Sequence, residues 1–221
     1  MTNEIVVPEQ LGRPEQMWRR AAALALMEAS AASGYEYCLG DSEVSCSHSN
    51  GTWTLALITD GRALFYGQDV DCSDTSYRGD KPVDLLVNAP DWVPMAELRE
   101  LNDGYELGYL YWWDEGAWAR APYPDFVADD GLEASCGSQS GLFDDAALAE
   151  DFADSGYEDQ EAAERFIARV AARTVDAAAL TELMATASQP STSPREARLA
   201  TALEWAARLG VAATAPTAAA R

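Results

Sequence analysis

The chain has 221 residues, of which 37 are Asp or Glu and 15 are Lys or Arg, so its formal net charge at pH 7 is −22. A protein this acidic repels phosphates and acidic headgroups, which argues against direct binding to nucleic acid or to an anionic membrane. It lacks a run of about 18 apolar residues that could span a bilayer. Its 48% hydrophobic content excludes a disordered acidic chain.

The first residues, Met1 to Pro8, contain no basic segment followed by a long apolar run. We therefore expect no secretory signal and a cytoplasmic location. In that compartment cysteines stay reduced. Free thiols are thus expected at all four cysteines: Cys38, Cys46, Cys72 and Cys136.

A long helix is predicted from Pro14 to Ser33, because proline suits the first helical position and Gly34 suits the C-terminal end. Apolar residues recur between them at helical spacing and form a broad stripe. The stripe comprises Met17, Trp18, Ala21, Leu24, Ala25 and Met27. We expect this helix to cover one face of a sheet.

Short strands are predicted at 35–39 and 43–46, followed by a hairpin within Trp53–Asp69. The hairpin turn is Asp60-Gly61, a dipeptide typical of two-residue turns. That turn would pair Leu55 with Tyr66, and it would place Phe65 on the face opposite to Leu55. Since both faces are apolar, we expect the hairpin to be central and covered on both sides.

After a loop at 73–81 and a short helix at 95–101, the sequence predicts a second hairpin. Its strands are 107–113 and 117–121, and Gly116 suits the positive φ of the turn between them.

From Phe143 onward the sequence is rich in alanine at helical spacing. The last helix has a capping box from Ser193 to Glu196 and a stop at Gly210. Helices are expected near 143–154, 159–173, 176–187 and 194–209. The fold class is therefore α+β: an antiparallel sheet of hairpins with a leading helix, followed by an alanine-rich helical region.

Two regions and a tail follow from this pattern: an α+β region at 1–135, a helical region at 142–210 and a disordered tail at 211–221. The Ser- and Gly-rich stretch 131–141 is the expected linker. One composite domain fits a chain of this length equally well.

The excess negative charge lies in residues 36–164, which contain 29 acidic and five basic residues, a net charge of −24. Five of the seven tryptophans lie in the same segment. Large aromatics on an acidic face are what a protein-binding surface needs, although tryptophans also commonly fill cores. The expected partner-binding residues are Trp112, Trp113, Asp114, Glu115 and Trp118.

The stretch that includes Asp69, Asp71 and Asp74 is similar to the start of a calcium-binding loop, with oxygen ligands two residues apart. The glycine required at the sixth position is replaced by Asp74, and Asp80 stands in place of the final Glu. A divalent cation at the three aspartates and an ordinary solvated loop therefore both stay open. No other cofactor is expected.

The run Trp53–Asp69 together with Asp84–Trp92 resembles a set of uncharacterised proteins from G+C-rich actinobacteria. This resemblance covers about a third of the chain, and it implies no activity and no catalytic residue. In general character the chain is also similar to immunity proteins that neutralise polymorphic toxins.

The leading hypothesis is a non-catalytic binding protein of the immunity or antitoxin type, whose acidic middle segment attracts a basic protein partner. A second hypothesis is a carboxylate- or metal-dependent enzyme that uses the three aspartates or the pair Asp114 and Glu115. A third is a structural subunit that self-associates through its alanine-rich helices. The sequence leaves the oligomeric state open.

Overall fold

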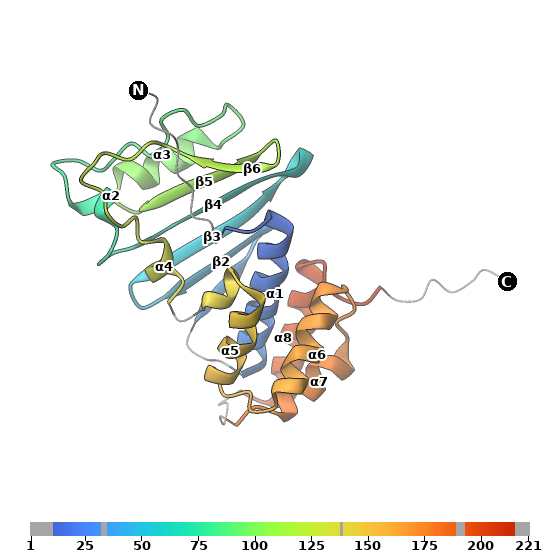
Figure 1. The fold of residues 1–221 in the computed structure, drawn as a ribbon. Coiled ribbons are helices and arrows are strands. Elements are labelled where there is room, and N and C mark those ends of the chain that lie inside the picture. Colours follow the sequence, from blue (N-terminus) through green and yellow to red (C-terminus); the bar gives the residue numbers. More distant parts are fainter. Residues whose placement is uncertain (1–10, 32–34, 138, 189–192, 215–221) are drawn as a thin grey trace.

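The computed structural model describes residues 11–31, 35–137, 139–188 and 193–214, and it shows a six-stranded antiparallel sheet with helices on both sides (Figure 1). The strands follow one another in chain order across the sheet. They are β1 Glu36–Leu39, β2 Glu43–His48, β3 Gly51–Ile58, β4 Arg62–Asp69, β5 Tyr109–Asp114 and β6 Ala117–Arg120. The helices are α1 Pro14–Ala31, α2 Asp74–Tyr77, α3 Met95–Asp103, α4 Leu132–Ser135, α5 Asp145–Asp154, α6 Gln160–Ala171, α7 Ala177–Ala185 and α8 Arg195–Arg208. The predicted α+β class, with its leading helix, antiparallel sheet and later helices, is confirmed.

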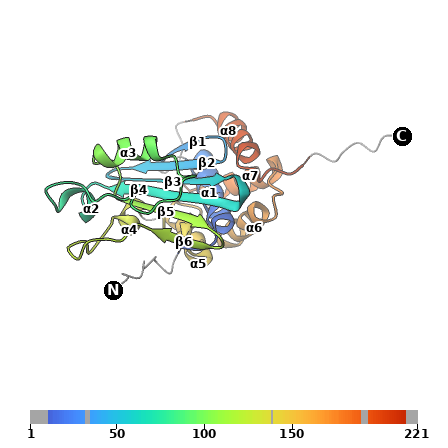
Figure 2. The ribbon, with the colours of Figure 1, turned by 90° about the horizontal axis from the view of Figure 1, so that it is seen from above.

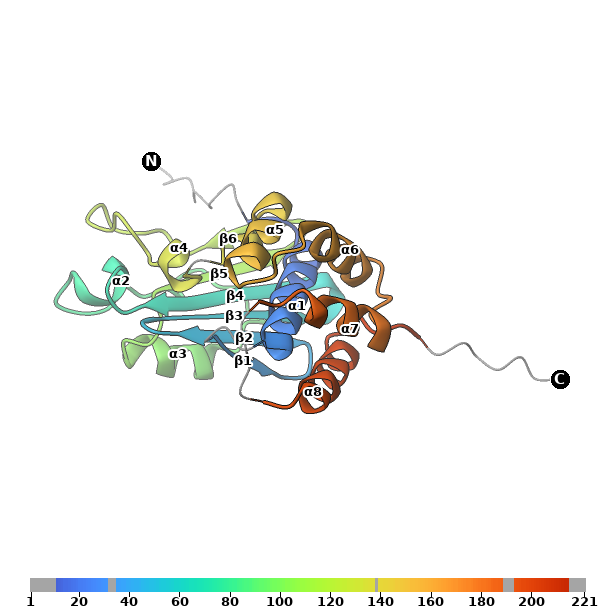
Figure 3. The ribbon, with the colours of Figure 1, turned by 90° about the horizontal axis from the view of Figure 1, so that it is seen from below.

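Helix α1 lies between the sheet and a layer formed by α5, α6, α7 and α8 (Figure 3). Its apolar residues point to both neighbours, and a helix that is apolar on most sides is stable only when buried. Several side-chain hydrogen bonds attach it to the helical layer, two of them with buried partners. Trp18 Nε1 donates to the carbonyl oxygen of Leu209 at 3.0 Å, and the Tyr157 hydroxyl donates to that of Met27 at 2.9 Å. The leading helix therefore joins the sheet to the helical layer.

The other face of the sheet is covered by α3 and the segment before it (Figure 2). Leu64 of β4 and Leu110 of β5 pack there against Leu85 and Leu98. The buried Asn102 accepts the backbone N–H of Leu85 at 3.1 Å, which fixes the segment to α3. The central hairpin is thus covered on both sides, as its two apolar faces predict.

The register predicted for that hairpin is wrong by one residue. Ile58 pairs with Arg62 and Leu55 pairs with Phe65, because the connection has three residues, Thr59–Gly61. Asp60 and Gly61 both adopt positive φ angles, 63° and 74°, a conformation that Asp tolerates better than most residues. A shift of one residue exchanges the two faces of a strand. Phe65 therefore joins Leu55 in the core beneath the sheet.

Several ends of elements differ from the prediction. The expected loop 73–81 contains α2, and α8 begins at Arg195 with Pro194 at the N-cap position, one residue later than predicted. Aspartates cap three helices by accepting backbone N–H groups. These are Asp144, Asp159 and Asp176. Part of the negative charge of the chain therefore stabilises helix ends.

The segment 131–141, predicted to be a linker, contains α4 and the 3₁₀ turn Ser140–Leu142. Ser135 and Gln139 are buried and bonded to the sheet: Tyr109 and Ser135 hydroxyls lie 2.7 Å apart, and Tyr37 donates to Gln139 Oε1 at 2.8 Å. One continuous cluster of buried residues extends from the sheet through α1 to α5–α8.

Residues 211–214 are not frayed, in contrast to the prediction for the tail. Val211 is buried, its carbonyl oxygen accepts the N–H of Val175 at 3.0 Å, and Ala213 donates to Val175 at 2.8 Å. Residues 215–221 lie outside the described part. Within the described residues, no helix is both long and apolar enough to cross a membrane.

Candidate protein-binding surface

The three aspartates of the predicted cation site have partners inside the protein. Asp69 is buried, and its Oδ1 accepts the N–H groups of Asp71 and Cys72 at 3.0 and 2.9 Å. Asp71 accepts from the side-chain amide of Asn50 at 2.5 Å. In the described ranges no three His, Cys, Asp or Glu side chains are grouped so that they would hold a metal ion. The carboxylates shape the turn after β4.

Asp74 joins α2 to the loop 124–130. Its Oδ2 accepts the backbone N–H groups of Ala128 and Asp129 at 2.9 and 3.2 Å, and Arg78 Nη1 lies 2.7 Å from the same oxygen. The bond from Ala128 is the main cause that lowers the pKa of Asp74, and Asp129 and Arg78 add to it. The carboxylate is therefore ionised at neutral pH and holds the loop against the helix.

The variant Asp74→Ala is expected to loosen the loop 124–130. Hydrogen exchange of the Ala128 and Asp129 amides should become at least several-fold faster, because both lose their acceptor. Asp125→Ala, which removes an exposed carboxylate from the same loop, is the matched control and should leave both rates unchanged. The pKa of Asp74 is lower in the folded chain than in the unfolded chain. Ionised Asp74 therefore stabilises the fold above pH 3.8, and this stabilisation is lost as the pH falls through the pKa of the folded state. Unchanged exchange in Asp74→Ala would contradict this role.

The tryptophans of the predicted partner-binding site point to different faces of the sheet. Trp112 is only 6% exposed and belongs to the core on the α3 side. Trp113 and Trp118 pair across β5 and β6 with their rings edge to face at 5.5 Å. Trp118 Nε1 donates to the carbonyl oxygen of Gly12 at 2.7 Å. The structure therefore does not bring the three tryptophans together on one surface.

Asp114 and Glu115 at the hairpin turn have different surroundings. Asp114 accepts from Trp92 Nε1 at 2.9 Å and lies 3.5 Å from Arg62 Nε, and the Trp92 bond is the main cause that lowers its pKa. Glu115 is exposed at the tip. A carboxylate that acts as a general acid needs a raised pKa, so Asp114 is arranged as a structural anion.

The single histidine and the buried thiols do not form an activated nucleophile. All four cysteines are free, and burial raises the pKa of Cys46 to about 12 and that of Cys136 further. His48 Nε2 lies 2.8 Å from the carbonyl oxygen of Ser135, and its ring packs on Tyr35. A reactive cysteine requires a lowered pKa, so these groups serve the core.

A different surface becomes visible only in three dimensions. Tyr77 and Tyr105, which are 52% and 39% exposed, stack nearly parallel with ring centroids 6.2 Å apart. The Tyr77 hydroxyl accepts from Gln68 at 3.1 Å and donates to the Tyr105 carbonyl oxygen at 3.2 Å. The rings are therefore held in place although they face solvent.

Phe126 is 45% exposed and lies beside Arg78 and Gly79, which directly follow Tyr77 in the chain. Its ring tip lies 3.6 Å from the point that a Cβ atom would occupy at Gly79, and its carbonyl oxygen accepts from Arg78 at 3.3 Å. The loop that carries it runs beside α2 in Figure 3. We call Tyr77, Tyr105 and Phe126 the aromatic end. All large hydrophobic side chains exposed in the described residues lie between positions 70 and 126: Val70, Tyr77, Val87, Met95, Tyr105 and Phe126.

The segment that carries the aromatic end is strongly negative. Residues 69–130 contain 15 acidic and four basic residues, a net charge of −11. Two of the bases, Arg78 and Arg99, form ion pairs with aspartates, and Arg120 lies over the Tyr123 ring. Exposed carboxylates occur close in sequence to all three aromatics: Asp80, Asp103, Glu106, Asp125 and Asp129. The surface can attract a cationic group and offer it aromatic faces.

The tryptophan-based prediction missed the aromatic end, although the sequence contains a signal for it. Tyr77 and Tyr105 have no large apolar residue next to them in the chain, and Phe126 has only Val127, so none of the three belongs to an apolar periodicity. An aromatic residue outside an apolar periodicity has no predicted core face to bury it.

The chain matches no protein family model, and no curated protein and no solved structure is similar to it at a significant level.

Proposed function

We propose that this protein is a non-catalytic acidic binding protein of the cytoplasm that engages a basic protein partner through the aromatic end. One observation supports this most: the stacked, exposed pair Tyr77 and Tyr105 lies in the strongly negative segment 69–130. Exposed aromatic side chains that are already ordered lose little conformational entropy on binding. Such residues commonly contribute most of the affinity at protein interfaces.

The charge supplies the second half of the argument. The net charge of −11 over residues 69–130 attracts a cationic protein toward this surface, and such steering raises association rates by about 10- to 1,000-fold. Arginine is the side chain that fits best, because its guanidinium stacks on an aromatic face and also pairs with carboxylates. Neutralisation of a basic toxin, the role of immunity proteins and antitoxins, is the activity that we favour for such a surface.

The test uses a short peptide of alternating arginine and glycine, titrated by calorimetry. The double variant Tyr77→Leu/Tyr105→Leu should bind about tenfold more weakly, because each exposed cation–π contact contributes about 0.5–1 kcal/mol. Affinity of the wild type should fall steeply as salt rises.

The matched control is Glu161→Gln/Glu204→Gln, which removes two exposed carboxylates of α6 and α8 while leaving the aromatic end intact. Its affinity for the peptide should be much closer to that of the wild type than the affinity of the tyrosine variant is. Equal affinities for the wild type and the tyrosine variant, or an affinity that does not depend on salt, would refute the proposed site.

A further inference from the structure

A second surface lies in the helical layer, between α5 and α6. It is a groove of about 840 Å³, lined by one face of each helix. Five alanines and one isoleucine make up half of its lining: Ala146, Ala149 and Ala153 of α5 and Ile167, Ala168 and Ala171 of α6. The groove is separate from the aromatic end, which lies at the far end of the sheet (Figure 1).

The two helices use a different face for the core. Leu148 and Phe152 of α5 and Phe166 and Val170 of α6 are buried in the main cluster. The alanines stand next to these positions, and most of them remain exposed. The hairpin of α5 and α6 is therefore fully packed on its inner side and leaves a concave outer side with short side chains.

Short side chains determine what the groove can accept. Interaxial distances of packed helices are 8–10 Å and depend on the size of the side chains at the contact. Alanines at the spacing of 146, 149 and 153 let another helix approach closely along α5. The 12 residues of α6 give a groove length of about 18 Å, which matches a helix of about three turns.

The charges define the chemistry of the occupant. Among the described residues that line the groove, every charged side chain is a carboxylate: Asp145, Glu150, Glu158 and Glu164. Asp145 is paired with Arg20 at 2.7 Å, whereas Glu150 and Glu158 are exposed. The acidic edge is complementary to arginine or lysine on a bound segment.

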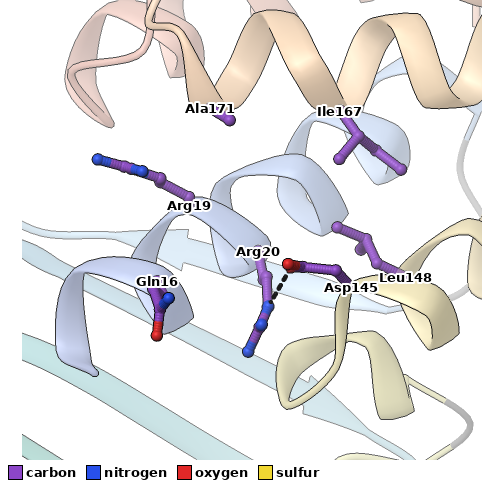
Figure 4. A pocket seen from close by; sticks show the side chains of 7 residues that line it. All are labelled: Gln16, Arg19, Arg20, Asp145, Leu148, Ile167 and Ala171. Atoms are coloured by element: carbon purple, nitrogen blue, oxygen red, sulfur yellow. Dashed lines mark hydrogen bonds and ion pairs between the residues drawn. The ribbon is translucent and has the colours of Figure 1, made fainter. Parts of the chain in front are cut away.

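A smaller pocket continues the groove at the Asp145 end, and it contains positive charge (Figure 4). Its volume is about 120 Å³, and it shares Asp145, Ile167 and Ala171 with the groove. Arg20 turns toward Asp145 there, while Arg19 extends away from that pair. The groove thus runs from carboxylates at Glu158 to a guanidinium at Arg19.

We propose that this groove binds an amphipathic helix of a partner protein, with small apolar residues against the alanines and basic residues against the carboxylates. The partner helix lies with its N-terminus near Glu158 and its C-terminus near Arg19, because helix N-termini are favoured by negative charge and C-termini by positive charge. This is the helix-in-groove mode of recognition. The proposal does not depend on the aromatic end.

The probe is a synthetic amphipathic helical peptide with alanine and leucine on one face and arginine on the flanks, with a scrambled peptide of identical composition. Titration is followed by NMR of the full chain. The helical peptide should shift the amides of α5 and α6 and bind at least tenfold more tightly than the scrambled one. A spin label at its C-terminus should broaden resonances near Arg19. Equal binding of the two peptides would show only non-specific charge attraction and would overturn the proposal.

The variant Ala153→Phe/Ala168→Phe fills the groove from two exposed positions and should weaken binding by at least tenfold. Ala200→Phe, on an exposed position of α8, is the matched control and should bind normally. Thermal melting verifies that each variant folds. If Ala200→Phe weakens binding as much as the folded groove variant does, the assignment of the site is wrong.

Two further measurements distinguish a partner helix in this groove from binding at the aromatic end and from self-association. Tyr77→Leu/Tyr105→Leu should bind the helical peptide as the wild type does, so that failure of one site leaves the other testable. Sedimentation reports whether the groove is occupied by a second copy of the chain instead. If the wild type forms a dimer and Ala168→Phe abolishes it, a second copy of the chain occupies the groove. That result would overturn the proposal of a partner helix.

Discussion

The variant Trp53→Ala is expected to lower the free energy of unfolding by about 4 kcal/mol. Trp53 is fully buried on β3, and its ring lies edge to face with Tyr37 at 5.9 Å between centroids and tilted against Phe65 at 6.4 Å. Truncation removes the aromatic contacts and leaves a cavity between the sheet and α1. Since domains are typically stable by about 5–15 kcal/mol, this change removes a large part of the total.

The control for this prediction is Trp53→Phe, which keeps an aromatic ring. Trp53 Nε1 is buried and has no hydrogen-bond partner among the described residues. Because an unsatisfied buried donor is unfavourable by about 1–3 kcal/mol, its removal offsets part of the lost packing. We expect Trp53→Phe to be destabilised by less than half as much as Trp53→Ala in urea denaturation. Equal losses in the two variants would contradict this role of the aromatic ring and of the indole N–H.

The second large effect concerns Asp151, a carboxylate that is only 5% exposed. Burial is the main cause that raises its pKa to about 6, although it accepts the Gly141 N–H at 2.8 Å. The unfolded chain loses this proton at lower pH than the folded one does. The protonated carboxyl group of Asp151 therefore stabilises the fold fully below pH 3.8, and this stabilisation is lost as the pH rises through about 6.

Asp151→Asn keeps an oxygen for the Gly141 N–H and has no charge. A pKa of about 6 in place of 3.8 corresponds to about 3 kcal/mol. Water at the neighbouring exposed residues screens part of this, so we expect the variant to be more stable than the wild type by about 2 kcal/mol at about pH 8. At about pH 4 the two should be nearly equal.

Urea denaturation across this pH range measures the difference between Asp151→Asn and the wild type. The control Asp154→Asn removes an exposed carboxylate one turn away and should change stability by less than about 0.5 kcal/mol. A difference between Asp151→Asn and the wild type that stays constant with pH would show that the carboxylate is not the cause.

The sequence predicted the elements of this fold well because each carries a strong local pattern. The stripe from Met17 to Met27 predicted α1, and the two apolar runs around Asp60-Gly61 predicted the central hairpin. The register failed at one point, where Asp60 adopts a positive φ and the connection gains a residue. Turn length depends on backbone conformation at single positions, which periodicity does not report.

The candidate surfaces were predicted less well, because they depend on contacts between distant segments. Tyr77 and Tyr105 are 28 positions apart and meet only through the packing of α2 against the segment after α3. The tryptophans were predicted to bind a partner because they are large and aromatic. Side chains alternate between the two faces of β5, however, and Trp112 lies on a face that is buried in the core. Sequence identifies which residues are aromatic or acidic, and only the tertiary fold decides which of them face solvent.

The position of α1 has a consequence for how the chain is made. This helix is synthesised before every strand, yet its outer face is covered by α8, whose last residue is Arg208. At about 5–20 residues per second, a ribosome needs about 10–35 seconds to pass from Ala31 to Arg208. Throughout this interval the apolar residues of α1 that face the later helices lack their final neighbours. Nascent chains stalled before α8 should therefore bind chaperones that recognise exposed apolar segments, and chains released after it should not.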